Sequence, residues 1–202
     1  MQLLNTLNYR TMKSEHKLKK HLVLVILVTG VLLLIPLIAM QFTTEVVWTL
    51  SDFLIAGLLL SCTGAAFVFA LHKMENNTYR LGVGIALIST LFLVWANLAV
   101  GIVGNESEDI NVLYYIIPAI GLVGAFLSRF QSHGLSYTLS AMAVIPLIIA
   151  IVALMGYLQE PPHNTATQIL GINMFFTVMF SLAAISFRNV ARDENEKELI
   201  AE

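Results

Sequence analysis

Apolar residues along this chain are concentrated in six long stretches separated by short polar segments. The stretches cover residues 21–40, 53–71, 80–104, 112–128, 137–157 and 169–187. Each is close to the roughly 20 residues that an α-helix needs to cross the hydrocarbon core of a bilayer. Because lipid offers no partners for backbone polar groups, each stretch predicts a transmembrane helix. We therefore predict an all-α fold, an integral membrane bundle of six transmembrane helices.

The basic residues predict the orientation of this bundle. Cutting the chain at the six stretches leaves seven flanking segments, and all 11 Lys and Arg residues fall in the odd-numbered ones, with Arg80, the first residue of the third stretch, counted in the segment before it. Lys and Arg accumulate in cytoplasmic segments, so both termini are predicted in the cytoplasm. The opposite, outer segments hold no base, and their acidic residues are Glu45, Asp52, Glu106, Glu108, Asp109 and Glu160.

Composition supports the membrane class. Hydrophobic residues make up 57% of the chain and charged residues 12%, whereas soluble domains carry about 25% charged residues. We expect a basic cytoplasmic arm over residues 1–20, a membrane domain over 21–187 and a charged cytoplasmic tail over 188–202. The arm is open to two interpretations: a short helix lying among anionic headgroups, or a disordered anchor.

The residues inside the stretches argue against several kinds of chemistry. No stretch carries Asp, Glu, Lys or Arg near its centre, where proton pumps and many ion-coupled transporters place one. The single cysteine, Cys62, excludes an intramolecular disulfide and a Cys-based metal site. The sequence holds no zinc-protease motif. We therefore expect no enzyme, catalytic residue, metal or cofactor, and we expect the lipid bilayer rather than nucleic acid as partner.

Small residues recur at helical spacing on three of the stretches. Such residues let a second helix approach closely, whether from this chain, from another copy or from a partner membrane protein. The predicted packing residues are Gly57, Ser61 and Gly64 in the second stretch, Gly101 and Gly104 on one face with Asn97 in the third, and Gly121 and Gly124 in the fourth.

Polar and aromatic residues gather toward the expected outer ends of the helices. The candidate site comprises Glu45, Trp48, Asp52, Trp95, Asn97, Glu106 and Asn173, with Asn111 in the same turn as Glu106. Carboxylate and amide oxygens suit hard cations, so one interpretation is a shallow site for a cation or small polar solute. The other is structural: Asn97 and Asn173 bond across helices, and Asp52 follows an N-cap at Ser51.

Two segments, Thr49–Phe53 and Trp95–Glu106, resemble a group of uncharacterised small bacterial membrane proteins with six spans. The resemblance covers the second to fourth stretches best. It implies a bacterial inner-membrane location and directs attention to Asp52, Trp95 and Asn97, together with Glu106. It brings no activity or substrate.

Three functional hypotheses follow. In the first, the protein binds or transports a small solute or cation from the outer side, through a cavity that reaches Asp52 and Asn97. In the second, it is a structural or accessory subunit that packs against a partner membrane protein along an exposed seam at Gly57, Ser61 and Gly64. In the third, which the missing motifs disfavour, it is a membrane-embedded enzyme or cofactor protein.

Overall fold

The computed structural model describes the backbone of residues 2–157 and 165–201, and the side chains of residues 16–72, 74–156 and 165–201. The described backbone is helical with connecting turns and contains no strand. Six of its helical segments are long and apolar enough to cross a membrane. The predicted fold class is thus confirmed, and the chain is a multi-pass membrane protein. Glu160, one of the expected outer acids, lies outside the described residues.

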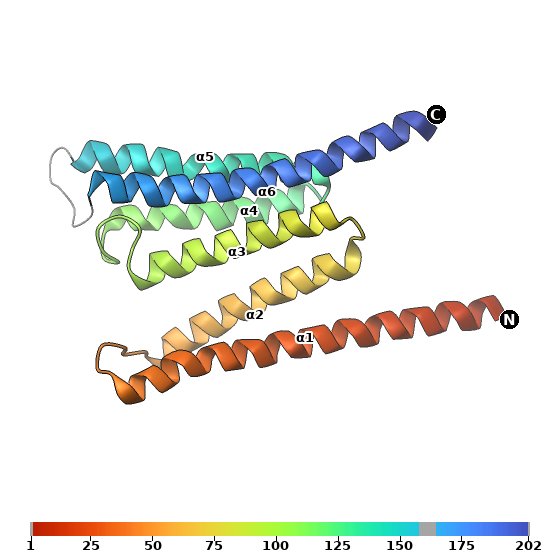
Figure 1. Cartoon of the computed structure of the whole chain (residues 1–202), viewed down its shortest axis with the longest axis horizontal. Helices are drawn as coiled ribbons and strands as arrows, with labels where there is room; N and C mark the ends of the chain where they lie inside the picture. Colours follow the sequence, from red (N-terminus) through yellow and green to blue (C-terminus); the bar gives the residue numbers. More distant parts are fainter. Residues whose placement is uncertain (1, 158–164, 202) are drawn as a thin grey trace. The chain divides into compact units, whose positions relative to one another are not determined.

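The chain forms two compact units, Met1–Glu75 and Asn76–Glu202. The first unit is a helical hairpin of α1 (Gln2–Phe42) and α2 (Leu50–Lys73), which lie side by side in opposite directions (Figure 1). The predicted arm is the first part of α1 rather than a separate helix. Residues 2–29 contain no Gly or Pro and many strong helix formers, so nothing in that sequence ends the helix.

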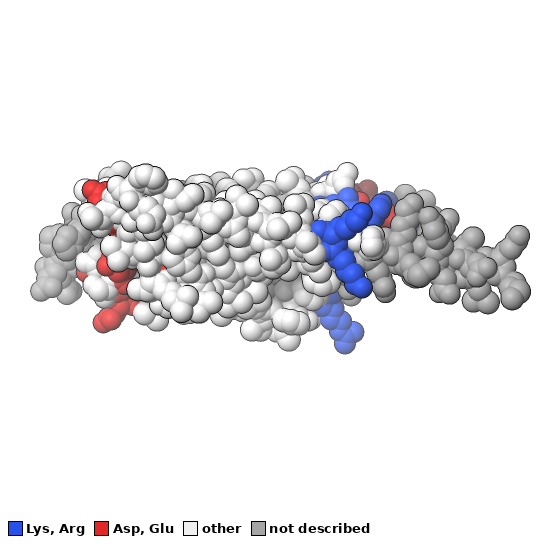
Figure 2. Space-filling view, turned by 90° about the horizontal axis from the view of Figure 1, so that it is seen from below, with Lys and Arg blue, Asp and Glu red and all other residues white. Residues whose placement is uncertain are grey.

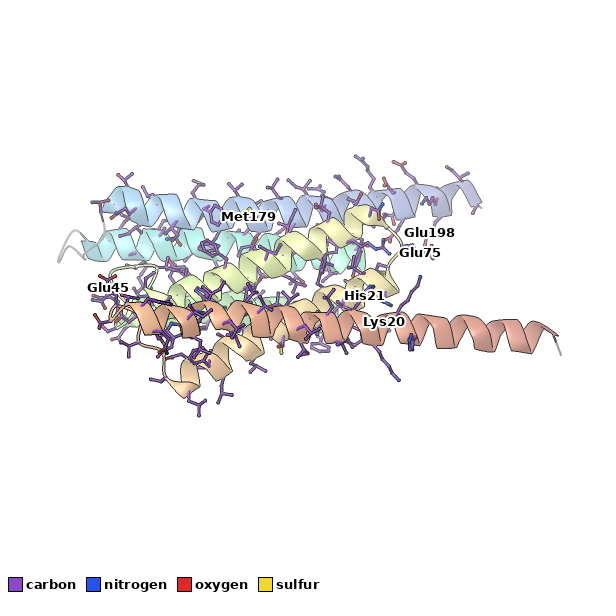
Figure 3. All side chains as sticks on the ribbon, turned by 60° about the horizontal axis from the view of Figure 1, so that its bottom comes forward. Lys20, His21, Glu45, Glu75, Met179 and Glu198 are labelled. Atoms are coloured by element: carbon purple, nitrogen blue, oxygen red, sulfur yellow. The ribbon has the colours of Figure 1, made fainter. Side chains whose placement is uncertain are left out.

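Labelled polar side chains of the first unit lie toward its two ends. Figure 3 shows Glu45 at one end of the hairpin and Lys20, His21 and Glu75 toward the other. The imidazole rings of His21 and His72 meet edge to face there, with their centroids 5.1 Å apart. The visible face in Figure 2 likewise carries its Lys and Arg near one end and its acidic residues mostly at the other, with an uncharged band between them.

The glycines of α2 pack against α1. A Cβ atom on Gly64 would lie 2.6 Å from Cγ1 of Val25, and one on Gly57 would lie 3.3 Å from Cδ1 of Leu33. The small-residue seam therefore serves the hairpin itself. At these two glycines it is covered by α1 and is not an exposed docking face.

The N-terminus of α2 differs from the prediction. Thr49, not Ser51, is the N-cap: its backbone is extended (φ −87°, ψ 169°), whereas Ser51 is already helical. The Asp52 carboxylate accepts a hydrogen bond from the Thr49 backbone N–H at 2.6 Å, and the Thr49 hydroxyl oxygen accepts one from the Asp52 N–H at 3.4 Å. This reciprocal pair is a capping box, in which Asp takes the place of the usual Glu.

The second unit contains α3 (Asn77–Ala99), the 3₁₀-helix η1 (Asp109–Tyr115), α4 (Ile116–Leu127), α5 (Ser132–Tyr157) and α6 (Ala166–Ala201). Among these elements, α5 and α6 share the most extensive contact, and α3 packs on α6 (Figure 1). The fully buried rings of Phe176, Phe180 and Phe187 lie on α6 and fill the core. The helix α6 runs on through the predicted tail to Ala201.

Glycines again mark close helix contacts in this unit. A Cβ on Gly121 of α4 would lie 3.1 Å from Sδ of Met142 on α5, and one on Gly124 would overlap Thr138. Gly82 of α3, which the sequence pattern did not single out, makes room for the Phe187 ring.

The third helix ends earlier than predicted. α3 stops at Ala99, and the following segment, residues 100–108, contains Gly101 and Gly104 with φ values of +71° and +70°. Glycine adopts this left-handed backbone at little cost and is a poor helix former. The prediction that both glycines share a helical face with Asn97 is therefore wrong.

Candidate functional site

One buried side chain, Asn111, organises the loop between α3 and η1. Its Oδ1 accepts hydrogen bonds from the backbone N–H groups of Ile102 and Val103, both at 3.0 Å. Its Nδ2 donates to the carbonyl oxygens of Val103 (2.9 Å) and Asn105 (2.6 Å). A Cβ on Gly101 would lie 2.7 Å from that same Nδ2. The left-handed glycine thus lets the loop fold tightly around the amide.

Asn97 joins this loop to the end of α3. It is only 4% exposed, and its Nδ2 donates to the Asn111 carbonyl oxygen at 3.0 Å. Its Oδ1 is buried and has no hydrogen-bond partner. Buried polar atoms are almost always paired, so an unpaired one is a candidate contact for water or ligand.

A pocket of about 330 Å³ opens at this position. Its size lies at the lower end of the range for small-molecule sites, which is about 300–1,000 Å³. The residues that line it are Asn97, Leu98, Glu106, Ser107, Glu108, Asp109, Asn111, Val112 and Tyr115. The three carboxylates among them are exposed, and none forms an ion pair within the described residues.

The pocket collects two of the predicted site residues, Asn97 and Glu106, together with Asn111. Trp95 lies in α3 two positions before Asn97 and is not among the lining residues. Tyr115 also lines the pocket but is not among the predicted residues, because a single aromatic residue near a helix end is common at membrane interfaces.

Asn173 has a different part in the second unit. Its Oδ1 accepts a hydrogen bond from the Tyr114 hydroxyl at 2.8 Å, and its Nδ2 donates to the Ile169 carbonyl oxygen at 2.9 Å. Asn173 and Tyr114 are both fully buried. With both ends of the amide engaged, Asn173 joins η1 to α6, as the structural interpretation expected, and it does not line the pocket.

The remaining predicted residues belong to the first unit. The Asp52 carboxylate closes the capping box with Thr49. The Trp48 ring packs edge to face on Phe53, with their centroids 5.1 Å apart. Glu45 is exposed. None of these three residues is among those that line the pocket.

Among the described residues, no three His, Cys, Asp or Glu side chains come together in a way that suits a metal ion. The pocket volume of about 330 Å³ instead suits a small molecule. Comparisons of the chain with protein-family models, curated proteins and solved structures found no match.

Proposed function

We propose that this protein resides in a bacterial inner membrane with both termini in the cytoplasm and binds a small, positively charged solute from the outer side. The orientation is supported by the distribution of its 11 Lys and Arg residues. The membrane is supported by the resemblance of Thr49–Phe53 and Trp95–Glu106 to bacterial proteins. The binding site is the pocket at the end of α3.

The observation that carries the proposal is the unpaired Oδ1 of Asn97. Leaving a polar atom buried without a partner costs about 1–3 kcal/mol. A donor on a bound solute removes that cost. A protonated amine is such a donor, and its N–H groups form strong hydrogen bonds with an amide oxygen such as Oδ1 of Asn97.

The surroundings of Asn97 favour a cation over a neutral solute. The carboxylates of Glu106, Glu108 and Asp109 line the same pocket and bring negative charge without a basic side chain among the lining residues. A pocket lined with carboxylates raises the local concentration of cations. Tyr115 adds an aromatic ring, and aromatic rings attract ammonium groups.

The test is binding of small cations to the full chain in mild detergent, measured by isothermal titration calorimetry. The probes are ethanolamine, whose protonated amine carries N–H donors, a linear diamine, and propan-1-ol, the neutral carbon isostere of ethanolamine. We expect saturable binding of a cation and much weaker binding of the neutral isostere. The surface variant Glu106→Gln with Asp109→Asn should weaken binding about thirtyfold, because each of the two charges, at about 4 Å, contributes roughly fivefold even in water.

A matched control removes two acids from the first unit. Glu45→Gln with Asp52→Asn takes away the same charge from residues that do not line the pocket, and we expect it to leave the affinity unchanged. If this variant abolishes binding while the pocket variant retains it, the site lies at Asp52 and the proposal is wrong. Equal binding of ethanolamine and propan-1-ol would also contradict it.

The accessory-subunit hypothesis loses its main support, because α1 covers Gly57 and Gly64. It keeps one direct test, which is the recovery of a stoichiometric membrane-protein partner from native membranes in mild detergent.

A further inference from the structure

A second and larger hollow lies between α5 and α6, within the second unit. It is a groove of about 980 Å³. At one end it is lined by Arg188 and Arg192, and farther along by Val144, Leu147 and Ile185. Its lining thus changes from cationic to apolar along the helix pair.

The basic end of the groove has the composition of an anion site. Arg188, Arg192 and His133 line it together with the amides of Asn189 and Asn195, and no Asp or Glu is among the lining residues. Arg192 approaches Glu196 at 4.0 Å, an exposed pair of little energetic weight. Arg188 forms no ion pair within the described residues. Guanidinium groups bind phosphate through paired donors.

Several hydroxyls on the groove wall differ from most others in the same unit, although that of Ser140, also in the lining, donates to the Ser136 carbonyl oxygen at 2.8 Å. Those of Ser89, Thr138 and Ser186 donate to the carbonyl four residues earlier. Those of Ser136 and Ser181, which line the groove, form no hydrogen bond within the described residues. The hydroxyl oxygen of Thr177, also in the lining, is buried without a partner. The groove wall therefore carries hydroxyl groups, at Ser136 and Ser181, that are available to donate hydrogen bonds to a bound molecule.

The groove is open along its side. Tyr137 and Ile185, both in its lining, are 66% and 53% exposed. The apolar stretch of α6 ends at residue 187, directly before Arg188. Ser181 lies seven residues deeper, about 10 Å along the helix at 1.5 Å per residue. The cationic end thus sits where the headgroups are expected, and the open side faces the hydrocarbon.

We propose that this groove is a binding site for an anionic phospholipid. The phosphate is held by Arg188 and Arg192 with help from the Ser136 hydroxyl, and an acyl chain lies along Val144, Leu147 and Ile185. Basic pockets between membrane helices bind the headgroups of anionic lipids in this way. The site is independent of the proposed solute pocket, because the two share no lining residue.

The test is native mass spectrometry of the full chain in detergent, titrated with phosphatidylglycerol or phosphatidylcholine of identical acyl chains. We expect discrete complexes with phosphatidylglycerol at lower lipid concentrations than with phosphatidylcholine. The double variant Arg188→Gln, Arg192→Gln should weaken phosphatidylglycerol binding about thirtyfold, since each basic residue near a membrane surface contributes about fivefold. It should leave phosphatidylcholine binding nearly unchanged.

A matched double variant, Arg129→Gln with Lys197→Gln, removes the same charge from residues outside the groove and should keep the preference for phosphatidylglycerol. Ser181→Phe tests the apolar part: it fills the groove while leaving both arginines in place and should also weaken binding. Added glycerol phosphate should not displace the lipid, because the acyl chain contributes to binding.

Three results would overturn the proposal. The first is equal binding of the two lipids to the unmodified chain. The second is an equal loss in both double variants, which would indicate general surface charge. The third is the crosslinking of a protein segment instead of lipid, when a photo-crosslinking residue replaces Ser140 in the groove lining.

Discussion

At the residue scale, three asparagines of the second unit have three different roles. Asn111 folds a loop through four hydrogen bonds, Asn173 joins two helices, and Asn97, which lines the pocket, holds a buried side-chain oxygen without a partner. The sequence marks Asn97 and Asn173 as polar residues within apolar stretches, and Asn111 as the end of the acidic turn that follows the third stretch. It does not indicate which partner each one meets, because those partners are backbone atoms or lie up to 59 residues away.

The loop at Asn111 provides a matched pair of substitutions. Asn111→Asp removes the Nδ2 donor and leaves the carbonyl oxygens of Val103 and Asn105 without it. A buried acceptor left unpaired costs about 1–3 kcal/mol, so we expect a loss of at least about 2 kcal/mol in the free energy of unfolding. The measurement is reversible unfolding in mixed micelles.

Asn105→Asp is the control for the added charge. The side chain of Asn105 accepts hydrogen bonds from the N–H and hydroxyl of Ser107 through Oδ1, and an aspartate keeps that acceptor. The free energy of unfolding of the Asn105→Asp variant should stay close to that of the unmodified chain. Equal destabilisation by the two variants would show that charge, not the lost donor of Asn111, is responsible.

At the element scale, the start of α2 gives a clear test of which residue caps it. Thr49→Ala removes the capping hydroxyl and should cost about 1 kcal/mol of stability. Ser51→Ala removes only a hydroxyl that contacts Thr49 Oγ1 and should cost much less. Thermal unfolding of both variants decides the matter. If Ser51→Ala is the more damaging, Ser51 is the cap, and the capping box is not the stabilising feature.

The two glycines Gly64 and Gly30 allow a comparison within the hairpin. An alanine at Gly64 would press on the stiff, β-branched Val25, and overpacking of this kind costs about 1–3 kcal/mol. An alanine at Gly30 meets nothing within 4 Å and gains up to about 1 kcal/mol of helix propensity. We therefore expect Gly64→Ala to lower the Tm and Gly30→Ala to raise it. A higher Tm for Gly64→Ala would mean that α1 does not pack closely at this glycine.

The elements also show what the sequence predicts well and what it misses. Long apolar runs determine the number of helices, because the bilayer sets their length and no other backbone suits lipid. Helix ends depend on weaker and more local terms. The third helix ends five residues early because Gly101 turns left-handed and Asn111 supplies the hydrogen bonds that the helix would otherwise provide.

At the scale of the whole molecule, the candidate site predicted from the sequence is divided between two units. The sequence predicts how deep each residue lies in the membrane, and the predicted site therefore contains residues that share a depth near the outer surface. Lateral position around a bundle is not readable, because every helix shows a similar apolar surface. Glu45, Trp48 and Asp52 fall in the first unit, while the pocket around Asn97 is lined entirely by the second.

Orientation in the membrane has consequences for both proposed sites and is directly measurable. Cys62 is the single cysteine, so Cys62→Ser gives a background for placing one thiol at a time. We expect Ser107→Cys to react in intact cells with a maleimide that does not cross the inner membrane, and Lys197→Cys to react only after the membrane is opened. Because all 11 basic residues lie on one predicted side, the reverse pattern would require every one of them to be translocated.

The reverse labelling pattern would place the carboxylates near Asn97 in the cytoplasm and the Arg188 groove in the outer leaflet. The outer solute site would then be wrong, whereas the lipid site would stand in the opposite leaflet.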